Sequence, residues 1–163
     1  NPENAAAREG MAYASLLSGI TLAQVGLGSV HGLAAPLGAF FPIPHGVACG
    51  TLVASATAVN VRSLLERDPD HPALARYAEA GRVLCGEAFA DEGEARGALV
   101  HLLEDWTRKL HLPTLDQFGV TEEDHPRIVA HSRGSSMKTN PIELTDAEIE
   151  AILGSRQGSE RSG

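Results

Sequence analysis

Apolar residues recur every three or four positions along most of this chain, and no segment alternates apolar and polar residues like a half-buried strand. Breaks in the pattern coincide with glycine and proline: Gly26 with Gly28, Pro42 with Pro44, and the turn at residues 68–72. The pattern therefore predicts an all-α fold. Its helices are expected at residues 5–25, 29–40, 45–66, 72–86, 94–110, 121–133 and 145–153.

Residues that favour helix starts precede several of these segments. Asn4 is expected to cap the first helix and Ser29 the second, while Pro44 suits the first position of the third. Thr121 and Thr145 begin T-E-E-D and T-D-A-E, which combine a cap with acidic residues in the first turn. These signals place helix starts independently of the apolar pattern.

Two further features concern the helix at 29–40 and the end of the chain. Pro36 predicts a kink near the middle of that helix, because proline lacks the backbone N–H that a helix interior requires. Residues 154–163 are almost entirely polar and small, so they are expected to form a disordered tail. The predicted domain accordingly covers residues 1–153.

Composition excludes several classes of partner and adds little else. The 163 residues are 43% hydrophobic and 21% charged, as in ordinary globular proteins, and the net charge is −8. An acidic chain lacks the basic footprint that nucleic acids and anionic membranes require, so neither is expected as a partner. No apolar run reaches the roughly 18 residues of a membrane span, and the first residues do not resemble a signal peptide. These observations favour a cytoplasmic protein.

The two cysteines fit the same interpretation. Cys49 and Cys85 fall in helical segments and are expected to be free thiols in a reducing compartment. No charged residue nearby in sequence would activate either thiol, so a catalytic cysteine is not expected.

The Gly/Pro-rich stretch from Gly26 to Gly50 contains the clearest candidate chemistry. His31 and His45 flank an apolar segment within it, and two neutral imidazoles on rigid elements can bind a divalent metal. Either histidine alone would be read as a structural residue. Together, they lie in the motifs H-G-L-A-A-P-L-G and P-H-G-V.

These two motifs, with the preceding G-L-G, resemble the metal-site signature of the iron-containing (group III) alcohol dehydrogenases of the dehydroquinate synthase-like superfamily. Further along, L-P-T-L with G-V-T-E-E-D, and T-N-P with the following L-T, also resemble segments of this family. The resemblance covers about residues 4–153. It implies a helical bundle like the C-terminal domain of these enzymes.

By resemblance, His31 and His45 are two of the four metal ligands of the family. The other two, an Asp and a His one helical turn apart, have no counterpart upstream of His31. Ala35 stands where many members carry a further His beside the substrate. Proton transfer through a histidine at this position is therefore not expected. The resemblance also places Leu22, Lys138 and Asn140 near the substrate pocket.

The activity that the resemblance implies is the interconversion of a small alcohol and an aldehyde or ketone. The implied cofactors are Fe²⁺, Zn²⁺ or another divalent metal, and NAD or NADP, bound mainly by an N-terminal domain that this sequence lacks. The chain is therefore expected to be a C-terminal piece of such an enzyme, inactive alone, with a homo-oligomer as an option. Two ligands alone are expected to bind metal only weakly.

Three alternatives remain open at this point. A maleylacetate reductase needs no metal, and a glycerol dehydrogenase typically uses zinc; both are related enzymes. The third alternative is a helical interaction module without catalysis.

The remaining histidines do not share a helix face at ligand spacing, so they are expected to be surface or helix-end residues. They are His71, His101, His111, His125 and His131.

Overall fold

The structure is a computed structural model of the chain, and it describes residues 3–158. Within that range every regular element is a helix, which confirms the all-α prediction. The α-helices are α1 (Ala5–Val25), α2 (Ser29–Phe40), α3 (His45–Arg67), α4 (Ala73–Cys85), α5 (Glu92–Lys109), α6 (His125–Ser132) and α7 (Asp146–Gly154). Short 3₁₀ turns cover Leu115–Phe118, Glu122–Asp124 and Met137–Thr139.

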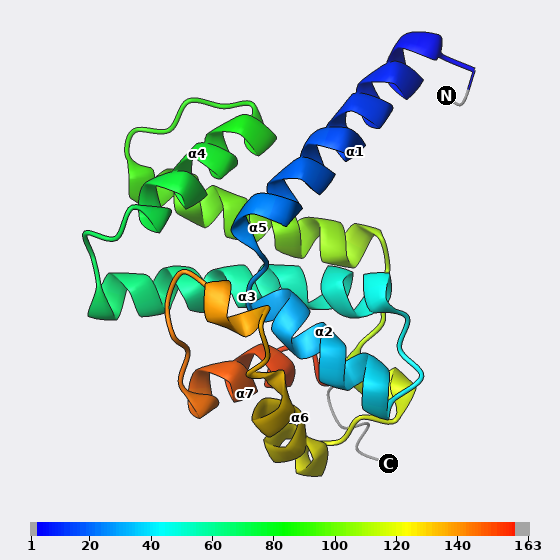
Figure 1. Ribbon diagram of the computed structural model, residues 1–163. Helices are drawn as coiled ribbons and strands as arrows, with labels where there is room; N and C mark the ends of the chain where they lie inside the picture. The colour runs from blue at the N-terminus through cyan, green and yellow to red at the C-terminus, as the bar shows by residue number, and fades with distance from the viewer. Residues whose placement is uncertain (1–2, 159–163) are drawn as a thin grey trace.

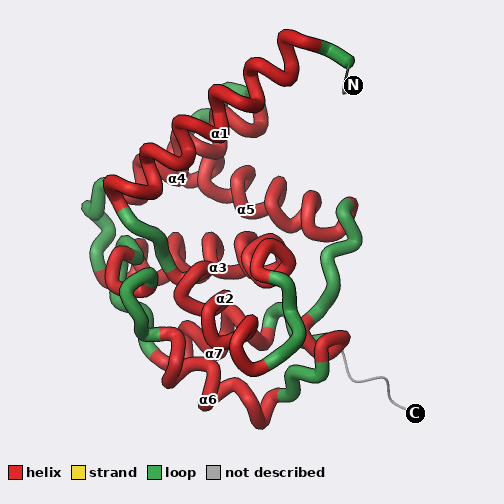
Figure 2. The backbone as a smooth tube through the Cα atoms, turned by 45° about the vertical axis from the view of Figure 1, so that its right-hand side comes forward, coloured by secondary structure: helices red, strands yellow, loops and turns green. Residues whose placement is uncertain are grey.

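Helix α3 lies at the centre of the molecule. The pair α4 and α5 packs on one side of it, and α2, α6 and α7 lie on the other (Figures 1 and 2). Many of its buried positions carry small side chains such as Ala48, Ala54 and Ala56, which allow neighbouring helices to approach closely. Leucine, isoleucine and valine from the surrounding helices complete the core, as the low aromatic content requires.

Helix α3 is also long and apolar enough to be considered as a membrane span. However, 56% of its most apolar window is buried inside the protein. Its apolar character is therefore accounted for by its place in the core.

Helix α1 projects away from this body (Figures 1 and 2). Asn4 caps it as predicted, because its side chain accepts a hydrogen bond of 3.0 Å from the Ala7 N–H. Gly26 ends it with φ of 74°, a conformation that glycine adopts without strain, and the axis then turns by 94° into α2. All side chains of α1 are exposed, including large apolar ones; the latter are Met11, Tyr13, Leu16, Leu17, Ile20, Leu22 and Val25.

Among the helix starts that differ from the predictions, two have a clear physical cause. The N-cap of α2 is Gly28, and Ser29, the predicted cap, is the first helical residue. The Ser29 N–H donates a hydrogen bond to the side chain of Asn140, which comes from a distant loop, so the helix start needs no cap from its own side chains. The segment predicted as one helix from 121 to 133 divides into a 3₁₀ turn and α6. Pro126 explains the division, since it has no N–H to bond the Glu122 carbonyl.

The residues after α7 are tied to the body as far as Gly158. Arg156 donates to the Thr51 hydroxyl at 2.8 Å and to the Leu112 carbonyl at 2.9 Å. The Gln157 amide donates to the Val120 carbonyl at 2.8 Å. Residues 156–158 of the predicted tail are thus hydrogen-bonded to the body, and the part of that tail at 159–163 lies outside the described residues.

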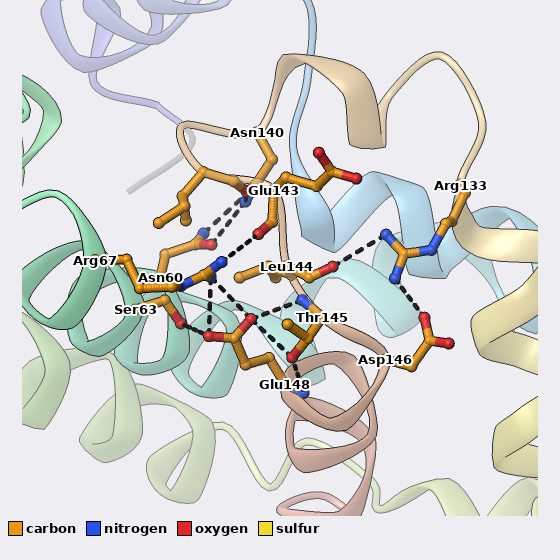
Figure 3. A network of polar contacts seen from close by, with 11 residues as sticks. Asn60, Ser63, Arg67, Arg133, Asn140, Glu143, Leu144, Thr145, Asp146 and Glu148 are labelled. Atoms are coloured by element: carbon orange, nitrogen blue, oxygen red, sulfur yellow. Dashed lines mark hydrogen bonds and ion pairs between the residues drawn. The ribbon is translucent and has the colours of Figure 1, made fainter.

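A polar network joins α3, the loop before α7 and the start of α7 (Figure 3). Glu148 accepts a hydrogen bond from the buried Ser63 hydroxyl. It also accepts two from the Arg67 guanidinium, at 2.9 and 3.0 Å. The same carboxylate accepts from the Thr145 N–H at 2.7 Å, while the Glu148 N–H donates to the Thr145 hydroxyl at 3.2 Å. The predicted T-D-A-E cap is therefore a capping box. Its Glu148 carboxylate also accepts the hydrogen bonds from Ser63 and Arg67 of α3.

The pKa of Glu148 reflects this network. Burial alone would raise it, but the hydrogen bonds from Ser63 and Thr145 and the charge of Arg67 outweigh burial and hold the pKa below its ordinary value. A carboxyl whose pKa is lowered in the folded state stabilises that state above its unfolded pKa, and the stabilisation is lost as the pH falls through the folded pKa.

We predict that Glu148→Gln, which mimics the protonated carboxyl, lowers the free energy of unfolding by about 1 kcal/mol near neutral pH. The difference from the wild type should shrink as the pH is lowered through the range in which carboxylates titrate. Urea unfolding followed by circular dichroism at several pH values measures it. Glu150→Gln, on an exposed position of the same helix, is the control, and an equal pH-independent effect of both changes would contradict the prediction.

The contact of α4 with α5 yields a second prediction. A Cβ on Gly81 of α4 would lie 2.0 Å from the Ala95 carbonyl oxygen of α5, so the backbones would have to separate. Gly97 lies inside α5, where a Cβ would meet nothing within 4 Å. Gly81→Ala should therefore destabilise the protein by about 3 kcal/mol, whereas Gly97→Ala should stabilise it by up to about 1 kcal/mol through helix propensity. Opposite shifts of the thermal unfolding midpoint are expected; shifts of the same sign would refute the close contact.

Candidate functional site

The first turn of α2 holds His31 in a fixed place. The Ser29 N–H donates to Asn140 Oδ1 at 3.0 Å, and the Thr139 hydroxyl donates to the Leu27 carbonyl. These two hydrogen bonds fix the start of this helix to the loop before α7. Asn60 of α3 holds Asn140 in turn, because Asn140 Nδ2 donates a hydrogen bond of 2.8 Å to Asn60 Oδ1. The His31 side chain is half-buried as a result of this packing.

His45 is the first residue of α3, directly after Pro44, and its side chain is exposed. Its ring centroid lies 5.3 Å from that of His31, with the ring planes tilted by 52°. The two imidazoles that the resemblance assigns to one metal thus lie next to each other, on α2 and α3. Metal ligation by them stays a prediction.

A third donor, which the sequence reasoning left out of the site, lies beside them. Cys49 follows His45 by one helical turn on α3, and its Sγ lies 3.5 Å from His45 Nε2. One donor atom from each of His31, His45 and Cys49 lies within 4.8 Å of the other two. The i, i+4 spacing in H-G-V-A-C was the signal that could have revealed it, because such residues share a helix face.

Burial shifts the pKa values of two members of this cluster, His31 and Cys49. Burial, and secondly the neighbouring His45, lower the pKa of His31, so its imidazole is neutral at neutral pH and offers a lone pair. Burial raises the pKa of the Cys49 thiol. Neutral imidazoles and a thiol that can lose its proton form a donor set suited to Zn²⁺, Co²⁺ or Fe²⁺, so the residues present fit a divalent metal.

A cavity of about 530 Å³ adjoins the cluster. His31 and Cys49 line it, together with Tyr77 of α4 and with Thr139 and Asn140 of the loop before α7. Burial raises the pKa of Tyr77, while a hydrogen bond with Asn60 acts in the opposite direction and is the weaker effect. The cavity is therefore lined by two members of the cluster, His31 and Cys49, and by uncharged polar side chains, whereas His45 is not among its lining residues.

The remaining predicted pocket residues are placed differently. Asn140 lines the cavity, but its amide is engaged with Ser29, Asn60 and the Ile142 carbonyl, so its visible role is to hold the loop. Lys138 is exposed and lines a separate hollow with Arg133 and Glu143. Leu22 is exposed on α1 and does not border the cavity. Their contact with substrate stays a prediction.

Ala35 occupies the position one turn after His31 on α2, where its exposed methyl group offers no proton donor or acceptor. Three of the remaining histidines are used within the fold. His71 accepts from the Ala73 N–H, His131 bonds the Arg127 carbonyl and His125 lies 3.4 Å from Gln157. No other group of histidine, cysteine and acidic residues in the described range has metal-site spacing.

Comparisons with known proteins identify the family of the chain. A family model described as the Fe-containing alcohol dehydrogenase family, C-terminal, matches residues 1–156. Alcohol dehydrogenase 4 of Schizosaccharomyces pombe is 33% identical over 154 residues, which make up 94% of this chain and 34% of the yeast protein. The 1,3-propanediol dehydrogenase of Klebsiella pneumoniae is 34% identical over 152 residues, or 92% of this chain and 37% of that enzyme.

A solved structure supports the fold assignment as well. The crystal structure of a 1,3-propanediol oxidoreductase matches with a TM-score of 0.79 and 29% identity, covering 94% of this chain and 39% of that one. The chain thus spans little more than a third of the length of these relatives. It belongs to the iron-containing alcohol dehydrogenase family, and it corresponds to the C-terminal helical part of its members.

Proposed function

We propose that this chain is the metal-binding, C-terminal helical part of an NAD(P)-dependent alcohol dehydrogenase that interconverts a small alcohol and an aldehyde or ketone. The observation that carries the proposal is the approach of His31 and His45, whose ring centroids are 5.3 Å apart, in a chain that belongs to this family. The names of the relatives, an alcohol dehydrogenase and a propanediol dehydrogenase, support the substrate class.

In this function the chain contributes binding and positioning. His31 and His45 would hold a divalent metal, and the adjoining cavity would receive the alcohol. When bound, the metal supplies Lewis-acid polarisation of the alcohol, and the nicotinamide cofactor accepts the hydride. Ala35 contributes nothing to proton removal, so the alcohol proton would leave through water, the cofactor ribose or another side chain.

The donor cluster also separates this proposal from its alternatives. A reductase without a metal would have no need for two facing imidazoles, so the cluster favours a metal-dependent enzyme over a maleylacetate reductase or a non-catalytic module. A zinc-using glycerol dehydrogenase remains compatible with the same donors. We further propose a cytoplasmic location and Fe²⁺ or Zn²⁺ as the metal.

The two histidines yield a direct test. We expect His31→Ala and His45→Ala each to weaken Zn²⁺ binding to the chain by at least about tenfold, because each removes a ligand. His101→Ala, which changes an exposed histidine of α5, should leave binding unchanged. Isothermal titration calorimetry measures the affinities, with circular dichroism to verify folding. Zn²⁺ binding that is unaffected by both changes would place the ligands elsewhere.

The chain alone should show no alcohol oxidation with NAD⁺ or NADP⁺, even with Fe²⁺ or Zn²⁺ added. The reason is that the relatives contain much more chain than the part matched here, and the resemblance places nucleotide binding in that additional part. Absorbance of reduced nicotinamide measures turnover, with 1,3-propanediol and other small alcohols as substrates. Metal-dependent turnover by the purified 163-residue chain would contradict this division of roles.

A further inference from the structure

We propose that Cys49 is a third metal ligand, which makes the site of His31 and His45 a thiolate-containing site that prefers Zn²⁺ and Co²⁺ to Mn²⁺. The inference rests on the proposed metal site and adds a ligand to it. The observation behind it is the convergence of one Sγ and two imidazole nitrogens, each within 4.8 Å of the others.

The separation of the two donors on α3 matches that of ligands to one ion. In a tetrahedral site with a metal–sulfur bond of about 2.3 Å and a metal–nitrogen bond of about 2.0 Å, the sulfur and nitrogen lie about 3.5 Å apart. Cys49 Sγ and His45 Nε2 are 3.5 Å apart in the structure. These two residues therefore need no rearrangement of the helix to bind the same ion.

The imidazole of His31 completes the set from a different helix. Two nitrogens bound to one tetrahedral ion lie about 3.3 Å apart, so the donors must close by at most about 1.5 Å from the observed limit of 4.8 Å. The His45 side chain is exposed, and rotation about its side-chain bonds covers such a distance without moving the backbone.

The three side chains also lack competing partners. Within residues 3–158, the only hydrogen bond that engages any of them is the contact between Cys49 and His45. His71, His125 and His131, by contrast, are each bonded to other parts of the fold. Three half-buried or exposed donors that meet only one another are available for a common ligand.

The chemistry of the donor set determines which ion it accepts. Cysteine binds metals as the thiolate, so the thiol proton is released to solvent when the sulfur–metal bond forms. Two neutral imidazoles and one thiolate carry a net charge of −1, which balances part of the charge of a divalent cation. Thiolate favours Zn²⁺ and Co²⁺, whereas Mn²⁺ prefers oxygen ligands, so loss of the thiolate should affect these ions unequally.

Cobalt titration of the chain under reducing, oxygen-free conditions tests the proposal, because a thiolate bound to Co²⁺ produces a near-ultraviolet charge-transfer band. The band should appear in the wild type and in Cys85→Ser, which removes the other free cysteine, and should be absent in Cys49→Ser. Zn²⁺ affinity should fall at least about tenfold in Cys49→Ser, with Mn²⁺ affinity nearly unchanged. Cys49→Ala should behave in the same way, and circular dichroism verifies that each variant folds.

The outcomes distinguish this inference from the proposed function. Co²⁺ binding that requires His31 and His45 but gives no thiolate band would refute ligation by Cys49 and leave the histidine site intact. A band that persists in both Cys49 variants would also refute it. Binding that is absent, or that is unaffected by loss of either histidine, would overturn the metal site and the inference together.

Discussion

The position of α3 in the core is the constraint on which the rest of the structure depends. This helix packs against α2, α4, α5 and α7, and its small buried side chains set how closely they approach. His45 and Cys49 occupy its first two turns, so their mutual geometry follows from the helix itself and their place in the molecule follows from core packing. Site geometry and stability therefore have a common origin.

His31 is positioned by a different kind of interaction. Its helix starts at a glycine without a side-chain cap, and the missing cap is replaced by Asn140, which Asn60 of α3 holds in place. These are hydrogen bonds between residues far apart in sequence, in contrast to the local i, i+4 relation of His45 and Cys49. The relation of the two imidazoles thus depends on the loop before α7 as well as on the core.

Local chemistry explains what could be predicted from the sequence. The helix at 5–25 was bounded correctly, because Asn4 and Gly26 act through neighbouring backbone groups. The cap of α2 could not be predicted, since its hydrogen-bond acceptor comes from Asn140, and the break at Pro126 was hidden by a strong capping signal before it. Charge patterns in the sequence do not point to Cys49, because its neighbours in the structure are two histidines, one of them on another helix.

The short connection between α2 and α3 has a consequence for assembly of the site. Only residues 41–44 join these helices, and Pro42 and Pro44 restrict the backbone of this linker. Because α2 also packs directly on α3, the backbone positions that carry the three donors are held close together, and little backbone entropy would be lost if one ion joined them. For the proposed site, the backbone is therefore held near the arrangement that a shared ion requires, and rotation of exposed side chains such as that of His45 supplies the remaining adjustment.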